Sequence, residues 1–355
     1  MKVKAAVLRG TEPRFELADL ELGEPRPDEI LVRGVASGIC HADLIAGANP
    51  RIPRPIVLGH EGAGVVERVG EAVRGLAPGD HVLLSFAACG QCELCVAGRP
   101  NYCRHGGRLR FGGSRLDGST AWSEGGQPVH GHYFGQSSFA TAFIASERNA
   151  VKIDPQLPLD VLAPLGCGIQ TGAGSVLNIL RPEVGSSLAV FGVGSVGLSA
   201  LLAAVAVGCT TIIAVDTVRS RLELASQLGA THVLEDGAEI RRILPHGVNF
   251  AFDTTGSASV LRTAVESLDI LGVAGFVAPV GTLELPVAAL FEGRSLRGIE
   301  QGDSLPQLFL PRLIELWRQG RFPFDKLVTF FPFEEINAAG QASLHGEVVK
   351  PVLRL

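Results

Sequence analysis

Hydrophobic residues follow two different patterns along this chain. Up to about residue 85, short apolar runs such as residues 30–35, 64–70 and 81–84 are separated by Pro and Gly, which is typical of β-strands joined by turns. A β-rich, partly barrel-like unit is therefore predicted. Residues 104–130 are rich in Gly, Ser and Arg without periodicity and indicate a long loop, after which residues 133–139 are expected to return to a strand.

The middle of the chain, residues 184–215, carries no charged side chain and is long enough to span a bilayer. Glycines interrupt it, however, and it ends in a β-branched run. A strand, a glycine turn, a buried helix and a second strand would give this pattern, because parallel strands are apolar on both faces. We therefore exclude a membrane span. With further strands at 249–256 and 273–277, we predict an α/β fold with a doubly wound parallel sheet over residues 169–299.

Composition narrows the class of protein. The chain has 355 residues, 46% of them hydrophobic, which is enough for two domains with buried cores. The net charge is −5 and the basic residues form no continuous stripe, so nucleic acid is an unexpected partner. The first residues are too polar for a signal peptide, so a cytoplasmic location is expected. Clustered cysteines in such a reducing compartment bind metal more often than they form disulfides.

Four of the seven cysteines follow one another with the spacing C-x2-C-x2-C-x7-C: Cys89, Cys92, Cys95 and Cys103. Four thiolates in one loop match a closed, tetrahedral structural zinc site, whose role is to fold the surrounding lobe. Iron–sulfur clusters use similar runs, but those usually end in Cys-Pro, which is absent here. Unrelated surface thiols at this density would be prone to oxidation.

Three further residues are candidate metal ligands, although they are far apart in the sequence. Cys40 lies in the β-rich part, His60 is followed by Glu61 and a Val-rich strand, and Cys167 begins a helix of small residues. Taken singly, each has an ordinary explanation, because a lone buried cysteine is usually a small hydrophobe. Together they could supply the two thiolates and one imidazole that a catalytic zinc with an open position needs. Cys209 is assigned to core packing.

A glycine-rich turn follows the first strand of the α/β region. Its pattern G-x-G-x-x-G joins an apolar strand to a helix, as a dinucleotide fingerprint requires, and comprises Gly192, Gly194, Ser195, Val196 and Gly197. Asp216 ends the next strand, 24 positions after Gly192, where a carboxylate would meet the ribose 2′-hydroxyl. This favours NAD over NADP. Arg219 and Arg221 keep NADP open, although residues 220–223 also match a capping box.

These motifs carry a family resemblance over nearly the whole chain. Residues 59–70, 134–139, 164–175 and 323–327, with the cysteine loop and the glycine turn, resemble zinc-dependent medium-chain alcohol dehydrogenases, in particular the bacterial benzyl (aryl) alcohol dehydrogenases. The resemblance implies a GroES-like catalytic domain formed by residues 1–168 and 300–355. It also implies a Rossmann cofactor domain formed by residues 169–299 and a homodimer or homotetramer that uses NAD and two zinc ions per chain.

The resemblance also implies roles for single residues. Catalytic zinc would be bound by Cys40, His60 and Cys167, with Glu61 and Asp43 in or beside its coordination sphere. The remaining cofactor contacts would come from His41 and Lys350 at the pyrophosphate, Thr171 at the nicotinamide, Asp216 and Arg221 at the adenosine ribose, and Thr255 and Val277. A pocket for a flat or unsaturated alcohol would be lined by Ile45, Phe86, Tyr133, Phe134 and Pro279, unless these residues only fill the core.

One position departs from the family pattern. Most members have Ser or Thr two residues after the first zinc cysteine, where a hydroxyl begins a proton relay, but this chain has Ala42, and Ile45 replaces a relay histidine. Alcohol oxidation can still run if the proton leaves through water, near His41 or the ribose. Alternatively, the enzyme reduces an iminium or a conjugated C=C, or the protein binds nucleotide without turnover.

Overall fold

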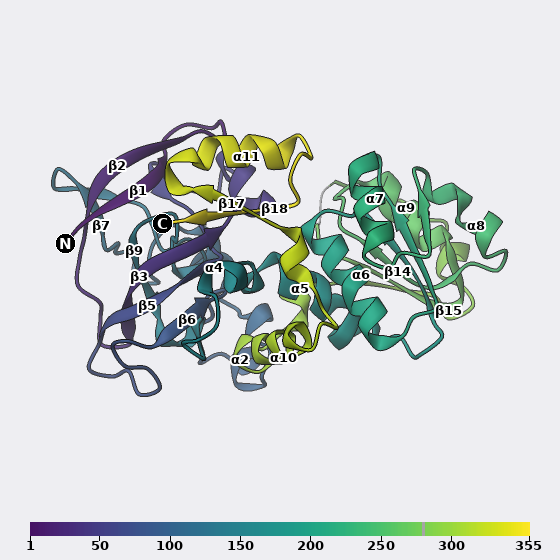
Figure 1. Cartoon of the computed structure of the whole chain (residues 1–355), viewed down its shortest axis with the longest axis horizontal. Coiled ribbons are helices and arrows are strands. Elements are labelled where there is room, and N and C mark those ends of the chain that lie inside the picture. Colours follow the sequence, from purple (N-terminus) through teal and green to yellow (C-terminus); the bar gives the residue numbers. More distant parts are fainter. Residues whose placement is uncertain (279–280) are drawn as a thin grey trace. The chain divides into compact units, whose positions relative to one another are not determined.

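The computed structural model describes residues 1–278 and 281–355 and divides into two compact units (Figure 1). Unit 1 comprises residues 1–167, 305–314 and 325–355, and unit 2 comprises residues 168–304 and 315–324. The chain therefore leaves the first unit, builds the second and returns. In the described part, no helix is both long and apolar enough to cross a membrane.

Two sheets and short helices form unit 1. One sheet has the strand order β4-β1-β2-β7-β8, and its strands are β1 (Lys2–Leu8), β2 (Phe15–Leu22), β4 (Ile56–Val57), β7 (Trp122–Glu124) and β8 (Gln127–Val129). The other has the order β10-β6-β5-β3-β18-β17 with β9 also paired to β3, and its strands are β3 (Glu29–Gly38), β5 (Gly62–Val69), β6 (His81–Leu84), β9 (Ala142–Ser146), β10 (Ala150–Ile153), β17 (Val328–Pro332) and β18 (Lys350–Arg354). The helices of this unit are α1 (His41–Leu44), α2 (Glu93–Val96), α3 (Gly106–Phe111), α4 (Leu159–Leu162) and α11 (Ile336–Leu344).

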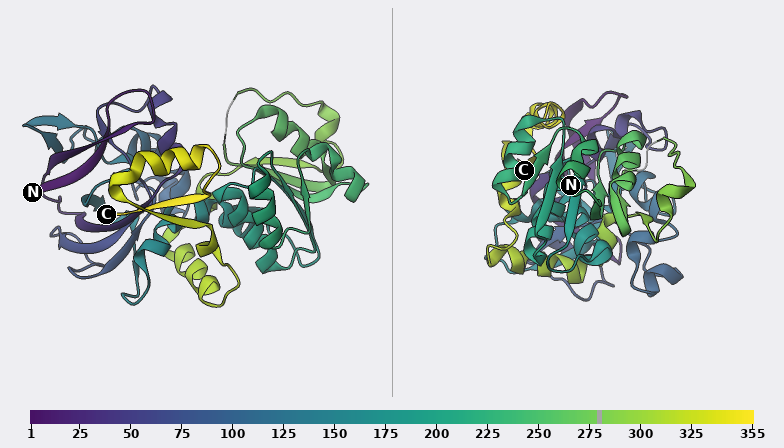
Figure 2. Two further views of the ribbon diagram at one scale, coloured as in Figure 1. Left: turned by 45° about the horizontal axis from the view of Figure 1, so that its top comes forward. Right: turned by 90° about the vertical axis from the view of Figure 1, so that its right-hand side faces the viewer.

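The C-terminal strand is an integral part of unit 1. Strand β18 pairs antiparallel with β3 through Val352 and Gly38, and parallel with β17. Figures 1 and 2 show this last yellow strand beside the purple strands of the N-terminal region. This pairing brings Lys350, at the start of β18, into the interior of the unit.

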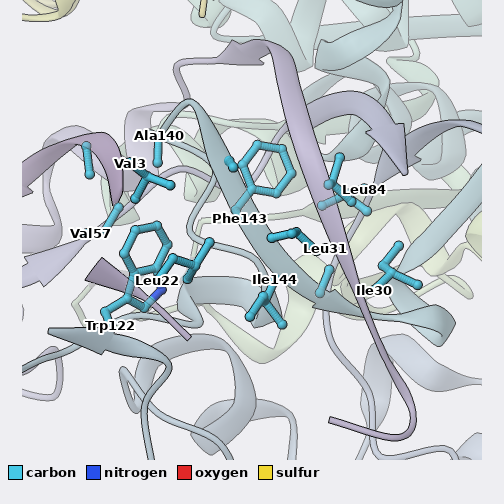
Figure 3. Packing of buried hydrophobic residues seen from close by; sticks show 14 of the residues in the cluster. Val3, Leu22, Ile30, Leu31, Val57, Leu84, Trp122, Ala140, Phe143 and Ile144 are labelled. Atoms are coloured by element: carbon cyan, nitrogen blue, oxygen red, sulfur yellow. The ribbon is translucent and has the colours of Figure 1, made fainter. Parts of the chain in front are cut away.

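A buried apolar cluster holds the two sheets of unit 1 together. Val3 and Leu22 of the first sheet pack with Leu31 and Phe143 of the second, and Trp122 covers one end (Figure 3). Each of these side chains is almost fully removed from water, and burial of this kind stabilises by roughly 25 cal/mol per Å² of apolar surface. The sheets are thereby fixed as a rigid support for the loops between their strands.

Unit 2 has the predicted doubly wound architecture. Its strands run in the order β13-β12-β11-β14-β15-β16, and every pair is parallel. The strands are β11 (Ser187–Phe191), β12 (Thr211–Val215), β13 (His232–Leu234), β14 (Val248–Asp253), β15 (Leu268–Phe276) and β16 (Ser295–Gly298). The helices are α5 (Gly168–Gly174), α6 (Ser195–Val207), α7 (Arg219–Gln227), α8 (Ile240–Ile243) and α9 (Ala258–Glu266), while α10 (Pro306–Arg318) lies in the returning segment.

Three local predictions were wrong. Residues 104–130 are not one loop, because they contain helix α3 and the hairpin of β7 and β8, which buries Trp122. Residues 133–139 are not a strand, because Tyr133–Gly135 form a 3-10 turn in which the φ of Phe134 is +52°, and residues 136–139 are irregular. Helix α7 begins at Arg219 after Val218, so Ser220 lies inside the helix and is no cap.

Candidate active site

The four candidate ligands expected near one metal lie together in unit 1. Sulfur atoms of Cys40 and Cys167, a ring nitrogen of His60 and a carboxylate oxygen of Glu61 are all within 4.8 Å of one another. Cys40 precedes α1, His60 and Glu61 lie between β4 and β5, and Cys167 precedes α5. Three chain segments therefore converge on a point that a single ion could occupy.

The chemistry of these side chains fits a divalent cation. Nδ1 of His60 lies 2.9 Å from Oδ1 of Asp43, which leaves Nε2 for another partner. That Nε2 is fully buried and has no hydrogen-bond partner among the described residues. An orphaned buried nitrogen is costly unless something binds it, and a carboxylate on the other ring nitrogen is the usual support of a metal-binding imidazole.

The two thiols also interact directly. Their contact, together with His60, holds the pKa of Cys40 well below its usual range, while Cys40 and burial raise the pKa of Cys167. Burial and mutual contact thus oppose ionisation of both thiols together, whereas a bound cation would favour the thiolate form of both.

Glu61 lies between this cluster and the C-terminal strand. Its carboxylate oxygens are 2.7 and 2.6 Å from Nζ of Lys350, and both side chains are fully buried. Lys350 also donates to the carbonyl of Ile39, the residue before Cys40. Burial raises the pKa of the Glu61 carboxyl, although the Lys350 ammonium opposes that rise. The structure thus gives Lys350 a contact within unit 1.

Aromatic rings cover His60 on two sides. Phe134 stacks on the imidazole with 4.3 Å between ring centroids, and Tyr133 meets it edge-on at 5.5 Å. Phe111, which was not singled out from the sequence, packs edge-on against both rings. Phe86 is buried with the guanidinium of Arg110 over its ring.

Of the two remaining proposed pocket positions, the structure describes one. Ile45 ends α1 and is 52% exposed, so its side chain is not part of the core. Pro279 lies outside the described residues.

The four-cysteine loop is a second compact cluster. Ligand atoms of Cys89, Cys92, Cys95 and Cys103 lie within 4.8 Å of one another, and none of these cysteines forms a disulfide. Backbone N–H groups of Arg104 and Cys95 lower the pKa of Cys92 to about 6, whereas burial and the contact with Cys92 raise that of Cys95 to about 12. Four thiols this close cannot all ionise alone, which is the situation that a structural zinc resolves.

The glycine-rich turn of unit 2 joins β11 to α6. Gly192 has a φ of +79°, and a Cβ on Gly197 would lie 1.9 Å from the carbonyl oxygen of Gly192, so only glycine fits. Gly194 has open space around it and caps α6, whose first residues are Ser195 and Val196. Free N–H groups at this end of a helix are suited to a pyrophosphate.

Asp216 follows β12 and reaches back to this turn. Its carboxylate accepts hydrogen bonds from the backbone N–H groups of Val193 and Val218, each at 2.8 Å. This fixes a negative charge at the carboxyl ends of the parallel strands, where a ribose is bound in doubly wound folds. Arg221 lies in the first turn of α7, and its buried Nε has no hydrogen-bond partner in the described part of the chain.

The other proposed cofactor residues are distributed over both units. Thr255 follows β14, and its methyl carbon lies 2.9 Å from the point that a Cβ on Gly192 would occupy. Val277 follows β15, and its backbone N–H donates to the carbonyl of Asp253. Thr171 is buried within α5 of the same unit. His41 is exposed in α1 of unit 1.

Two buried polar residues near His60 were missed in the sequence. Gln136 and Ser85 are fully buried and hydrogen-bond to segments that carry candidate ligands. The signal available was the polar run 136–138 between aromatic residues, which was interpreted as part of a strand.

Comparison with known proteins agrees with this arrangement. A family model described as the alcohol dehydrogenase GroES-like domain matches residues 26–155, and one described as zinc-binding dehydrogenase matches residues 195–316. A geraniol dehydrogenase from Castellaniella defragrans is 44% identical over 99% of this chain and 98% of its own. An S-(hydroxymethyl)glutathione dehydrogenase from Haemophilus influenzae is 34% identical, with 99% and 97% covered.

Solved structures give the same result. Benzyl alcohol dehydrogenase from Acinetobacter calcoaceticus superposes with a TM-score of 0.96 at 44% identity, covering 100% of this chain and 99% of that one. An alcohol dehydrogenase zinc-binding domain protein from Burkholderia ambifaria has a TM-score of 0.96 at 48% identity, with 100% and 99% covered. The chain therefore belongs to the zinc-dependent medium-chain alcohol dehydrogenase family.

Proposed function

We propose that this alcohol dehydrogenase transfers hydride between NAD and a primary aromatic or allylic alcohol, of the benzyl alcohol type, and the corresponding aldehyde. The observation that carries the proposal is the convergence of Cys40, His60 and Cys167, with an unpartnered imidazole nitrogen beside stacked aromatic rings. Relatives named for geraniol, an allylic alcohol, and for benzyl alcohol support this substrate class.

The proposed ligands would bind a catalytic zinc, and the four-cysteine loop would bind a structural one. When bound, zinc supplies a Lewis acid for the alcohol oxygen and NAD supplies the hydride acceptor. The chain itself holds the tautomer of His60 through Asp43 and balances the charge of Glu61 with Lys350. Phe134 and Tyr133 pack against the imidazole and exclude water from it, which would place aromatic rings beside the reacting oxygen of an unsaturated substrate.

NAD is proposed over NADP because of Asp216. Its carboxylate is fixed beside the glycine turn, where it would accept a hydrogen bond from a 2′-hydroxyl and repel a 2′-phosphate. Arg221 could offset that repulsion, so both cofactors belong in the test. His41 and Lys350 are proposed near the pyrophosphate, and residues 1–168 with 300–355 and residues 169–299 are proposed as the catalytic and cofactor domains.

The test is a panel of alcohols and aldehydes assayed with both cofactors, combined with zinc analysis. We expect two zinc ions per chain, reduction of NAD by benzyl alcohol or geraniol, and a lower kcat/KM with NADP. Saturated short alcohols should be poorer substrates. One zinc per chain and no turnover with any alcohol would contradict the proposal and favour a nucleotide-binding protein without activity.

A second candidate activity is favoured by one residue. Ala42 has no hydroxyl with which to take a proton from an alcohol, and its carbonyl oxygen lies 3.4 Å from the hydroxyl of Tyr133. Hydride transfer to an iminium needs no proton, and the enolate left by hydride addition to a conjugated C=C takes its proton at carbon, so neither reaction needs a relay from an alcohol oxygen. Fast reduction of such substrates with NADH, at rates far above benzaldehyde reduction, would support this alternative.

A further inference from the structure

The turn that follows strand β8 is held in an unusual conformation. His132, Phe134 and Ser137 have φ values of +56°, +52° and +56°, in the left-handed region that residues other than glycine rarely adopt. Such strain persists only where surrounding contacts impose it, and it is common at functional sites. The contacts of residues 136–139 therefore show what holds the turn in this conformation.

These residues run beside the segment that carries His60 and Glu61. The backbone N–H groups of Phe139 and Ser138 donate to the carbonyls of Leu58 and Gly59, each at 3.0 Å. On the N-terminal side of Ser138 the backbone turns away from this segment, and the side chain of Gln136 pairs with it instead. Its Nε2 donates to the carbonyl of His60 and its Oε1 accepts from the N–H of Gly62, both at 3.0 Å.

The amide of Gln136 thus takes the place of a peptide group. It clamps the backbone on both sides of Glu61, directly after the candidate ligand His60. Phe134, two residues earlier in the same turn, stacks on the imidazole of that histidine. The turn therefore contacts both the backbone and the ring of His60.

The same amide also reaches the segment of Cys167. Nε2 of Gln136 donates a second hydrogen bond to the carbonyl of Ser85 at 3.0 Å, and Oγ of Ser85 donates to the carbonyl of Gly166 at 2.8 Å. Gly166 directly precedes Cys167, and a Cβ on it would lie 2.2 Å from the carbonyl oxygen of Leu84. A chain of two fully buried polar side chains therefore joins the backbones of two candidate metal ligands.

We propose that Gln136 is a positioning residue of the catalytic metal centre, and that it acts with Ser85 to fix the separation of His60 and Cys167. This rests on the proposed zinc site. Groups that orient metal ligands by hydrogen bonds typically change metal affinity by about 10- to 100-fold when they are removed. Core filling alone would be served by an apolar side chain of the same length, without three hydrogen bonds to two separate segments, residues 60–62 and Ser85.

Three substitutions separate positioning from packing. Gln136→Met keeps the volume but removes every hydrogen bond of the amide, and Gln136→Glu keeps the acceptor for Gly62 but removes both donors. Ser85→Ala removes the hydroxyl that donates to Gly166 and keeps Gln136, so it is the mildest variant if Gln136 proves necessary for folding. Gln127→Met, at an exposed glutamine of β8, is the matched control.

The measurements are zinc content, the rate of zinc extraction by a chelator, and the ligand-field absorption of the cobalt-substituted protein. We expect extraction from one of the two sites to become about 10- to 100-fold faster in the Gln136 variants, with a smaller effect in Ser85→Ala. The cobalt spectrum of that site should shift. Zinc held by the four cysteines, which lie outside this network, is the internal reference and should be extracted at the rate of the control.

The outcomes also distinguish this proposal from the one on which it rests. Two zinc ions in the unmodified protein, with unchanged extraction rates and cobalt spectra in all three variants, would overturn the positioning role alone. One zinc ion in the unmodified protein would instead overturn the catalytic metal site. Equal acceleration at both sites would show a general loss of folding and would also count against positioning by Gln136.

Discussion

Asp43 joins two segments that are distant in the sequence. Its Oδ2 accepts the backbone N–H of Cys40 at 2.9 Å, and its Oδ1 accepts that of Gly59 at 3.3 Å while lying 2.9 Å from Nδ1 of His60. A fully buried carboxylate requires such partners. One side chain therefore sets both the start of helix α1 and the orientation of the imidazole.

Ala42, next to Asp43, gives a prediction about proton transfer. If alcohol oxidation is limited by loss of the hydroxyl proton, Ala42→Thr should raise kcat near pH 7 by at least about tenfold, since a placed proton relay contributes on the order of 10²–10⁴ in rate. The gain should shrink at high pH, where hydroxide from solvent can accept the proton without a relay. Steady-state kinetics with benzyl alcohol and NAD between pH 6 and 10 would measure it.

Ala48→Thr is the matched control, because Ala48 is exposed a few residues further along the same segment. It should leave the pH profile unchanged. If Ala42→Thr does not raise kcat for benzyl alcohol while an iminium or conjugated C=C substrate is reduced quickly, reduction of such substrates is preferred over alcohol oxidation as the function.

His132 gives a prediction about pH and stability. Burial, followed by the positive charge of Arg115, lowers the pKa of this imidazole to about 4, and the opposing charge of Glu29 does not compensate. Its Nε2 accepts the N–H of Ala121, which requires the neutral ring. The unfolded chain binds a proton near pH 6.5, so the folded protein loses stability as pH falls from about 6.5 towards 4, by about 2 kcal/mol at pH 5.

Urea unfolding at pH 7.5 and pH 5, followed by tryptophan fluorescence, measures this loss. His132→Gln retains an acceptor for Ala121 without a titrating group, so its free energy of unfolding should fall less than that of the unmodified protein. Acid release of zinc affects both proteins alike and cancels in the difference. Equal losses in the two proteins would show that His132 does not contribute.

Hydrogen bonds alone do little to fix the structure of the cysteine loop, residues 89–103. Helix α2 within it has four residues and no side-chain cap, and the segment gains order from sulfur atoms that accept backbone N–H groups, as Cys103 does from Cys89. We predict that Cys103→Ser lowers the zinc content by one ion per chain. Limited proteolysis should then cut within residues 89–103, because the folding free energy of such a lobe comes from its metal.

Cys209→Ser is the control for this change. Cys209 is half-buried in unit 2, away from both cysteine clusters in the sequence, and burial raises the pKa of its thiol to about 11. Its removal should change neither zinc content nor the cleavage pattern. Full zinc content in Cys103→Ser would rule out the four-cysteine site.

Elements with local signals could be predicted from the sequence, and elements set by distant contacts could not. The parallel strands and the glycine turn of unit 2 are coded by adjacent residues, so apolar runs and the G-x-G-x-x-G spacing sufficed to predict them. The turn at residues 133–139 was wrongly predicted as a strand because its conformation depends on contacts such as that of Gln136 with Gly62, 74 residues away. Likewise, no spacing rule links Cys40, His60 and Cys167, and they were combined from their ligand chemistry and then from the family resemblance.

At the scale of the whole molecule, unit 2 exposes apolar side chains near one edge of its sheet. Leu271 and Phe291 are 73% and 72% exposed, and Val287 and Ile270 are also exposed in the segments around β15 and β16. Strand β16 is the edge of the sheet, and an edge beside exposed apolar groups is a surface that another chain can cover. We propose this surface as the contact of a homodimer or homotetramer.

Leu271→Glu combined with Phe291→Glu should separate the chains, because each carboxylate would have to be buried in the contact without a partner, at a cost of several kcal/mol. Sedimentation velocity should show dimers or tetramers for the unmodified protein and monomers for the variant. Val184→Glu, at another highly exposed apolar residue of unit 2, should leave the assembly intact. A monomeric unmodified protein would refute the assembly, and an unchanged sedimentation coefficient in the double variant would place the contact elsewhere.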